Sequence, residues 1–305
     1  MSNKYSLGGY KIAIQARTRK TLLVEGKDDK ELFKRLNLHI SPDNIIDIDA
    51  AEILSGTEFA GLGAKAKVDA FLSNIPASSP ILTKFRTFVD REWENLVDQV
   101  TGDSRAWTPP VATGPRITSS GHSIENYSFY SQFILEYIAH FGSGTLTPNL
   151  QTQVQSSFAD VLNLAAAFSE ISRRRNAITR CCDVMQLGDV TWDGSKFILA
   201  TTLVPRLRAR QIVDPAGFVN DVMHAYTTKW SAAPWAQESH WHTHGHIGEM
   251  TIWVAIAAIA AYVGVPNAQC DELAFGRKDE RRRFWHTWLM KVGTAALSPM
   301  DQALA

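Results

Sequence analysis

The stretch TLLVEGKDDKELFKRLNL, residues 21–38, decides the fold class of this chain. It opens with four apolar or β-branched residues and then Glu25, which predicts a buried strand that stops at a turn. The residues that follow place Leu32, Phe33 and Leu36 at helical spacing, with acids at the start, where the helix dipole favours negative charge. A strand followed at once by a helix is the start of a βα unit.

The same order of strand, loop and helix continues to about residue 90. NIIDIDA, residues 44–50, predicts a second strand, and GLGAKAKVDAFLSNI, residues 61–75, predicts a glycine-containing loop that leads into a helix. FRTFV, residues 85–89, predicts a third strand. Parallel strands need helical crossovers, so this order predicts an α/β fold with a Rossmann-like parallel sheet flanked by helices.

The remainder of the chain lacks this alternation of strands and helices. Residues 148–187 lack strand-like alternation and are rich in Ala, Leu and Arg, which favours helices. Within LGDVTWDGSKF, residues 187–197, the pair Asp193 and Gly194 predicts a hairpin turn. We therefore expect a catalytic α/β domain over residues 1–140 and a mostly helical lobe over residues 141–305 for dimer, partner or substrate contacts.

Composition predicts a soluble cytoplasmic protein. The chain of 305 residues has 31 Lys and Arg against 31 Asp and Glu, so net charge does not decide for or against a nucleic-acid partner. Its three cysteines offer no disulfide framework, and the N-terminus lacks the apolar core of a secretory signal. The longest apolar stretch, residues 251–265, is too short to cross a membrane and predicts a buried helix.

Acidic side chains follow two of the predicted strands. Glu25 ends the first strand, while Asp90 and Glu92 follow the third. The carboxyl ends of parallel strands meet at one sheet edge, so these three carboxylates are expected to converge. They would repel one another without a divalent cation, and Mg²⁺ favours a few carboxylates together with waters and phosphate oxygens. This predicts a Mg²⁺ or Mn²⁺ site for phosphodiester chemistry; the alternative is that these acids only cap helices.

Two further acids belong to the candidate site. Glu125 in SSGHSIENY, residues 119–127, is expected either to complete the metal shell, to orient Asp90, or to cap a helix. Asp29 lies one turn past Glu25 and either supports the metal through a water or caps the helix that begins there.

Histidines and arginines supply the other candidates. His240, His242, His244 and His246 alternate along the chain, so an extended backbone would project all four to one side. Two roles are possible for these histidines: they could bind zinc or manganese, or one of them could supply a proton or a positive charge to a scissile phosphate. A basic group that could contact phosphates, or simply form a solvated surface, comprises Arg173 to Arg175, Arg180, Arg206, Arg208 and Arg210.

The segments VEGKDD, FVDREWE and HSIENY together resemble the TOPRIM domain of topoisomerases, bacterial primases and OLD-type nucleases. More narrowly, their order is similar to that of the small TOPRIM nucleases of bacterial anti-phage systems, the AriB-type effectors of PARIS systems. The resemblance implies that Glu25 matches the first-motif glutamate and that Asp90 and Glu92 match a DxD pair. Glu92 replaces the second Asp of that pair, which lengthens the arm by one methylene.

The resemblance also assigns the supporting residues. Asp29 matches the acid of VEGxxD, and Glu125 matches the acid of the later motif. In OLD-type nucleases a lysine near the end of the domain assists catalysis. This chain reads HGHIGE, residues 244–249, in the comparable segment, and His246 is the expected substitute.

Partners follow from the same resemblance. OLD-type nucleases carry an ATPase on the same chain, and a phosphate-loop motif is missing here, so a separate ABC-type ATPase subunit of the defence system is implied. Such a partner senses a phage trigger and releases the TOPRIM subunit, which assembles, here expected as a homodimer, and cleaves tRNA; DNA is the other possible substrate. The competing hypotheses are a non-catalytic TOPRIM sensor or scaffold bound to the ATPase, and a housekeeping RNA-processing or topoisomerase-like enzyme.

Overall fold

The chain divides into two units in a computed structural model that describes residues 4–110, 114–142 and 144–305. Unit 1 comprises Met1–Arg91, Pro109–Ser120 and His286–Ala305, and unit 2 comprises Glu92–Thr108 and Gly121–Trp285. The sequence places the domain boundary at residue 140. In the structure the chain enters unit 2 first at Glu92 and again at Gly121, and its C-terminal segment returns to unit 1.

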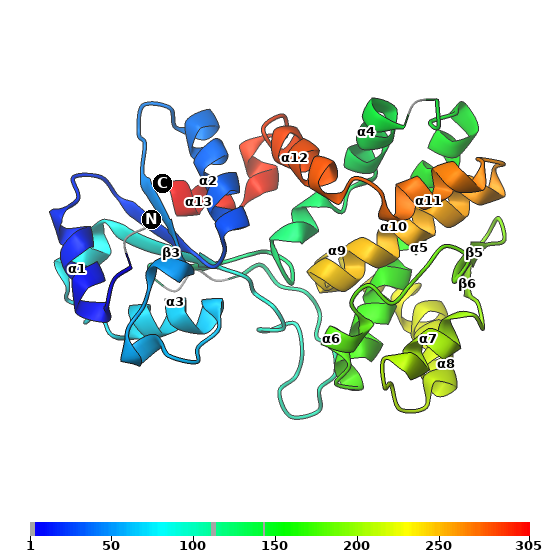
Figure 1. The fold of residues 1–305 in the computed structure, drawn as a ribbon, viewed down its shortest axis with the longest axis horizontal. Coiled ribbons are helices and arrows are strands. Elements are labelled where there is room, and N and C mark those ends of the chain that lie inside the picture. Colours follow the sequence, from blue (N-terminus) through cyan, green and yellow to red (C-terminus); the bar gives the residue numbers. More distant parts are fainter. Residues whose placement is uncertain (1–3, 111–113, 143) are drawn as a thin grey trace. The chain divides into compact units, whose positions relative to one another are not determined.

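A parallel sheet forms the centre of unit 1, as the sequence predicts (Figure 1). Its strands are β1 (Thr21–Val24), β2 (Asp47–Ala50), β3 (Phe85–Val89) and β4 (Arg116–Thr118), in the order β2-β1-β3-β4. In the register of the sheet, Thr21 pairs with Asp47 on one side and Phe85 on the other. All four residues of β1 are buried, which explains why its sequence is continuously apolar rather than alternating.

Helices cover this sheet because each presents an apolar stripe to it. The helices of unit 1 are α1 (Leu7–Ala16), α2 (Lys27–Ile40), α3 (Ala64–Ser73) and α13 (Met300–Leu304), with short 3₁₀ segments η1 (Ala51–Ile53), η2 (Thr57–Phe59) and η3 (Pro80–Thr83). One core cluster contains Tyr10 of α1, Leu23 of β1, Phe71 of α3 and Phe85 of β3. α1 has no counterpart in the sequence prediction.

Unit 2 is mostly helical, also as predicted. Its elements are η4 (Ile124–Ser128), α4 (Ser131–Phe141), α5 (Pro148–Arg174), α6 (Ile178–Cys181), β5 (Val190–Trp192), β6 (Phe197–Leu199), α7 (Leu203–Ala209), α8 (Pro215–His224), the π-helix η5 (Ala225–Trp230), α9 (Trp235–His242), α10 (Gly245–Tyr262) and α11 (Asn267–Phe275). α12 (Lys278–Leu289) contains the point where the chain passes back to unit 1, and η6 (Thr294–Leu297) follows it.

Two long helices, α5 and α10, pack against each other at the centre of unit 2. α10 contains residues 251–262 of the apolar stretch 251–265 that the sequence marked as a buried helix, but it begins earlier, at Gly245, and is therefore longer than that stretch. By length and composition it would pass for a membrane span, yet 72% of it is buried by the surrounding protein, as expected for the core helix of a soluble fold.

The predicted hairpin is confirmed. β5 and β6 pair antiparallel, and the Asp193 carboxylate accepts the backbone N–H groups of Ser195 and Lys196 at 2.8 and 2.9 Å. Gly194 has a φ of 99°, a conformation that side chains other than glycine rarely adopt.

Candidate functional site

Glu25 and Asp90 meet at the carboxyl edge of the sheet in unit 1. Glu25 Oε1 accepts the backbone N–H of Asp90 at 2.7 Å, which links the end of β1 to the end of β3. Both residues are only half-buried. The parallel pairing of the two strands is the reason that residues 65 positions apart come into contact.

Lys65 brings a positive charge to the same edge. Its Nζ donates to the backbone carbonyl of Asp90 at 2.5 Å and approaches that of Arg91 at 3.4 Å. Lys65 lies in the first turn of α3, where the helix dipole disfavours a cation. The sequence prediction missed Lys65. The signal that could have found it is a lysine in the first turn of a helix, just after the loop GLG, residues 61–63.

Arg91, between the two predicted acidic ligands, is only 2% exposed. Its backbone N–H donates to Ser119 Oγ at 2.9 Å, and its guanidinium donates to the carbonyl of Ser120 at 3.0 Å. Because a buried charge must be hydrogen-bonded, this side chain fastens the end of β3 to the segment after β4. In the sequence Asp90-Arg91-Glu92, the Arg91 side chain thus points into the protein while Asp90 stays half-exposed.

Asp29 takes the structural role that the sequence left open. Its Oδ2 accepts the backbone N–H of Gly26 at 2.8 Å, and Gly26 is the residue that precedes α2. This contact satisfies an N–H at the start of the helix. The water-mediated support of a metal, which the position of Asp29 one turn past Glu25 left open, stays a prediction.

Glu92 is the first residue of unit 2 and leaves the strand direction at once. Its φ is 53°, in the left-handed region that residues other than glycine rarely occupy. Its backbone N–H donates to the carbonyl of His122 at 2.6 Å. Such strained positions often occur at functional sites, where the surrounding contacts hold them in place.

A stack of rings follows Glu92 within unit 2. The indole of Trp93 packs edge-on against His122 with ring centroids 4.6 Å apart. The ring centroid of His122 lies 4.2 Å from that of His244. On Trp93 the guanidinium of Arg173 lies 5.2 Å from the ring centroid. These contacts join the segment after β3, the segment SSGHSIENY and the start of α10.

Glu125 reaches the start of α10. A Cβ atom built on Gly245, the first residue of that helix, would lie 2.6 Å from Glu125 Oε2 and would also clash with Ser123 Oγ. The absence of a side chain at Gly245 therefore lets the Glu125 carboxylate approach the positive end of the α10 dipole. Glu125 belongs to the 3₁₀ turn η4, which agrees with the expected helix start at this residue.

Asn126, next to Glu125, fixes the turn between α9 and α10. Its Nδ2 donates to the carbonyls of His240 and Thr243 at 2.5 and 3.0 Å, and its Oδ1 accepts the N–H of Ser123 at 2.8 Å. The side chain is fully buried. The IENY segment and the histidine segment therefore form one constellation, which the sequence prediction did not join.

The four alternating histidines do not lie on an extended backbone. His240 and His242 belong to α9, His244 precedes α10, and His246 lies inside α10, so they do not share one side. His246 lines a cavity of about 340 Å³ together with Cys182, Asp183, Glu249, Lys278 and other residues. The histidine that contacts His122 is His244, and its ring centroid is 6.2 Å from that of His246.

Burial sets the protonation of two of these imidazoles. Burial, followed by the charge of His246, lowers the pKa of His244 to about 4. Burial also lowers the pKa of His240 to about 4, against the opposing hydrogen bond with the carbonyl of Asn126. Both rings are therefore neutral at pH 7, where they can donate or accept a hydrogen bond but supply no positive charge.

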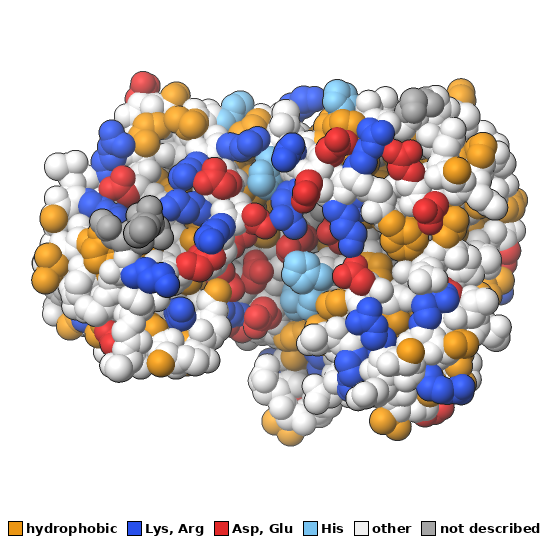
Figure 2. All heavy atoms as spheres, in the orientation of Figure 1, with side chains coloured by type: hydrophobic (Ala, Val, Ile, Leu, Met, Phe, Trp, Pro, Cys, Tyr) orange, Lys and Arg blue, Asp and Glu red, His pale blue; other side chains and the backbone are white. Residues whose placement is uncertain are grey.

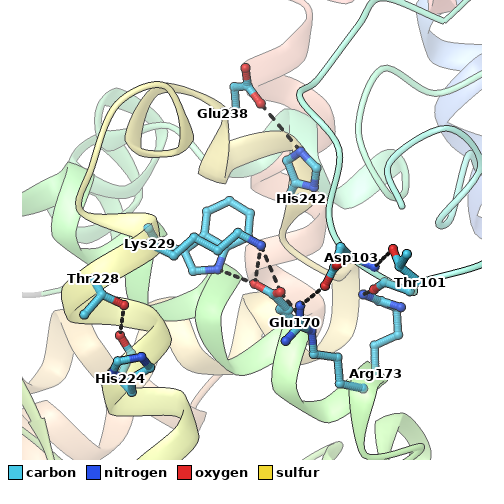
Figure 3. A network of polar contacts seen from close by, with 12 residues as sticks. Thr101, Asp103, Glu170, Arg173, His224, Thr228, Lys229, Glu238 and His242 are labelled. Atoms are coloured by element: carbon cyan, nitrogen blue, oxygen red, sulfur yellow. Dashed lines mark hydrogen bonds and ion pairs between the residues drawn. The ribbon is translucent and has the colours of Figure 1, made fainter. Parts of the chain in front are cut away.

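The loop that begins at Glu92 is held on α5 (Figure 3). Arg173 donates to the carbonyl of Gly102, and Arg174 pairs with Asp103. Arg174 also pairs with Glu170 at 3.1 Å, and this buried carboxylate is the centre of the network. These contacts fix the far end of the loop, so α5 positions the segment that starts at Glu92.

Three donors satisfy the Glu170 carboxylate. Besides Arg174, Lys229 Nζ lies 2.9 and 3.0 Å from its two oxygens, and the indole N–H of Trp230 donates to Oε2 at 2.8 Å. Burial lowers the pKa of Lys229, while its ion pair with Glu170 opposes the shift. The π-helix η5 supplies both of these donors, and single π-turns within helices are frequent at functional sites.

Glu25 and Asp90 thus lie together in unit 1, while Glu92, Glu125 and His246 belong to unit 2. Over residues 4–110, 114–142 and 144–305, no group of three or more His, Cys, Asp or Glu side chains is placed to hold a metal ion. Comparison of the sequence with protein-family models and with curated proteins gives no match.

Proposed function

We propose that this chain is a metal-dependent phosphodiesterase of the TOPRIM nuclease type, with Mg²⁺ or Mn²⁺ held by Glu25 and Asp90. The observation that carries the proposal is the contact between these residues at the carboxyl ends of two neighbouring parallel strands. Their donors are carboxylate oxygens, which suit Mg²⁺, an ion commonly bound by one or two carboxylates together with waters and substrate phosphates. Glu92 and Glu125 stay predicted ligands.

The residues around this pair support the same chemistry. When bound, the ion would polarise the phosphodiester and lower the pKa of a coordinated water. The hydrogen bond from the Asp90 backbone orients the Glu25 carboxylate. The ammonium group of Lys65, held at the Asp90 carbonyl, offsets part of the repulsion between the acids and can stabilise negative charge on a phosphate.

The biological role proposed here rests on the motif resemblance. In that role the protein is the effector of an anti-phage, abortive-infection system. It would be released in the cytoplasm by an ABC-type ATPase partner, and as a homodimer it would cleave RNA such as tRNA and so halt translation. Imidazole assistance by His246 belongs to the same proposal. His244, which contacts His122, is a second candidate for that assistance.

Cleavage by purified protein tests the proposal. Wild type should cut tRNA or DNA with Mg²⁺ or Mn²⁺, and a chelator should stop the reaction. Glu25→Gln keeps an oxygen that accepts the Asp90 N–H but removes the negative charge, so cleavage should fall on the order of 100-fold or more without loss of thermal stability. Glu31→Gln, on the exposed side of α2, is the matched control and should cleave as wild type.

Two results would contradict the nuclease assignment. One is full activity or full cellular toxicity in Glu25→Gln or Glu25→Ala; the other is cleavage that persists in chelator. If wild type cuts neither substrate even with the ATPase partner and its trigger, the non-catalytic scaffold becomes the better explanation.

A further inference from the structure

The arginine group of unit 2 separates into two sets in the structure. Three of its members pair with carboxylates: Arg174 with Asp103 and Glu170, Arg175 with Asp221, and Arg206 with the buried Asp189. A fourth, Arg173, is occupied by the Gly102 carbonyl and the Trp93 ring. The charges of these four arginines therefore hold the fold of unit 2 together.

Arg180, Arg208 and Arg210 form the second set. Arg180 donates to the backbone carbonyls of Gln211 and Asn176 at 2.7 and 2.8 Å. Arg208 and Arg210 are exposed on the last turn and the C-cap of α7. Within the described parts of the chain, none of the three makes an ion pair with a carboxylate, so three positive charges are left uncompensated.

The three side chains belong to one small region. The hydrogen bond from Arg180 to Gln211 brings the end of α6 to the residue that follows Arg210. The backbone N–H of Gln211 in turn bonds to the carbonyl of Arg208, which keeps this turn compact. Figure 2 shows Lys and Arg side chains gathered over the part of unit 2 where Figure 1 places α7 and α8.

Helix capping does not account for all of this charge. Arg180 and Arg208 lie in the last turns of α6 and α7, where a cation interacts favourably with the helix dipole. That dipole amounts to about half a charge at each helix end, so it offsets less than the charge of one arginine per helix.

We propose that Arg180, Arg208 and Arg210 form a surface that contacts the phosphates of a nucleic acid. Guanidinium groups present planar donors that match phosphate oxygens. Of the exposed residues nearby in the sequence, Thr179 and Gln211 are polar, while Ala209 and Val213 are apolar. The inference rests on the proposed nuclease function and names the part of unit 2 that holds its substrate.

Salt-dependent binding tests this surface without any cleavage. Labelled tRNA and labelled duplex DNA are titrated with protein in chelator, from about 50 to about 200 mM salt. The test variant is Arg208→Gln with Arg210→Gln. The control is Arg19→Gln with Arg35→Gln, which removes the same charge from two exposed arginines of unit 1.

Each lost phosphate contact should reduce the slope of log K against log salt by about 0.7 on a single strand and about 0.9 on a duplex. The test variant should therefore have a slope shallower by roughly 1.5 and a Kd raised on the order of tenfold at low salt. Its cleavage rate at saturating substrate should equal that of wild type, and the control variant should match wild type in both slope and Kd.

Equal slopes for the test and control variants would overturn the inference, as would a wild type that binds neither probe. The surface would instead recognise an acidic protein if the test variant binds both probes normally but loses association with an ATPase partner, and that result too would overturn the inference. Binding is measured in chelator, so these outcomes are independent of whether Glu25→Gln abolishes cleavage.

Discussion

Gly245 is the residue on which the placement of Glu125 depends. A methyl group at this position would overlap the Glu125 carboxylate and the Ser123 hydroxyl, both of which face the start of α10. Either η4, which carries Glu125, or the start of α10 would have to move. Because Glu125 is a predicted metal ligand, such a movement would affect both stability and the proposed activity.

Gly245→Ala should therefore cost about 1–3 kcal/mol of unfolding free energy, the usual range for an overpacked site. Urea unfolding measures this, and cleavage should fall with it if Glu125 serves the site. Gly8→Ala is the control, since a Cβ there meets no atom within 4 Å and alanine favours the helix. A Gly245→Ala protein as stable as Gly8→Ala would show that η4 and α10 adjust freely around Glu125.

At the scale of elements, α5 is the support of unit 2. Its central part packs on α10, while its C-terminal turn holds the loop that starts at Glu92. Glu170 in the same helix pairs with Arg174, which holds the loop at Asp103, and its carboxylate also accepts from Lys229 and from the Trp230 indole. Glu170 is buried, whereas the side chains of Lys229 and Arg174 keep 24% and 43% of their surface exposed, so water screens part of the charge that they would be left with.

Glu170→Gln should lower the unfolding free energy by about 1–3 kcal/mol, since Lys229, Arg174 and the Trp230 indole lose a charged acceptor. The comparison is Glu272→Gln, an exposed residue paired with Arg277, for which the change should stay within about 0.5 kcal/mol. Thermal and urea unfolding measure both. Similar small effects for the two variants would mean that solvent screens the Glu170 network.

At the scale of the whole molecule, unit 1 is completed by the end of the chain. α13 packs against β3, β4 and α2, and its Met300 and Leu304 are buried. The hydroxyl of Ser120, just after β4, donates to the carbonyl of Ser298 at 2.9 Å. The sheet therefore gains part of its cover only from residues more than 200 positions away from its first three strands.

Met300→Ala should destabilise the protein by about 2–5 kcal/mol, the cost of removing a fully buried methionine side chain. Gln302→Ala, on the exposed side of the same helix, should change stability by less than about 0.5 kcal/mol. Alanine is the better helix former at both positions, so helix propensity cannot explain a loss of stability and only burial separates the two variants. Equal unfolding midpoints would argue that α13 contributes little to unit 1.

The sequence by itself determined three parallel strands of the sheet, β1, β2 and β3, and the helices between them. Apolar runs that end in acids or turn residues, and helices with apolar stripes between them, lie within short windows, and the parallel order follows from the crossovers. That order is also why Glu25 and Asp90 were expected at one edge, where the structure has them in contact.

Tertiary contacts decided the rest. The hydrogen bond of the left-handed Glu92 with His122, the approach of Glu125 to Gly245 and the return of α13 to the sheet each join segments distant in sequence. The helical placement of the four histidines is a local difference from the extended backbone that the sequence predicted. Periodicity reports only which side of an element is buried. Which distant segment covers that side is set by the packing of the whole chain.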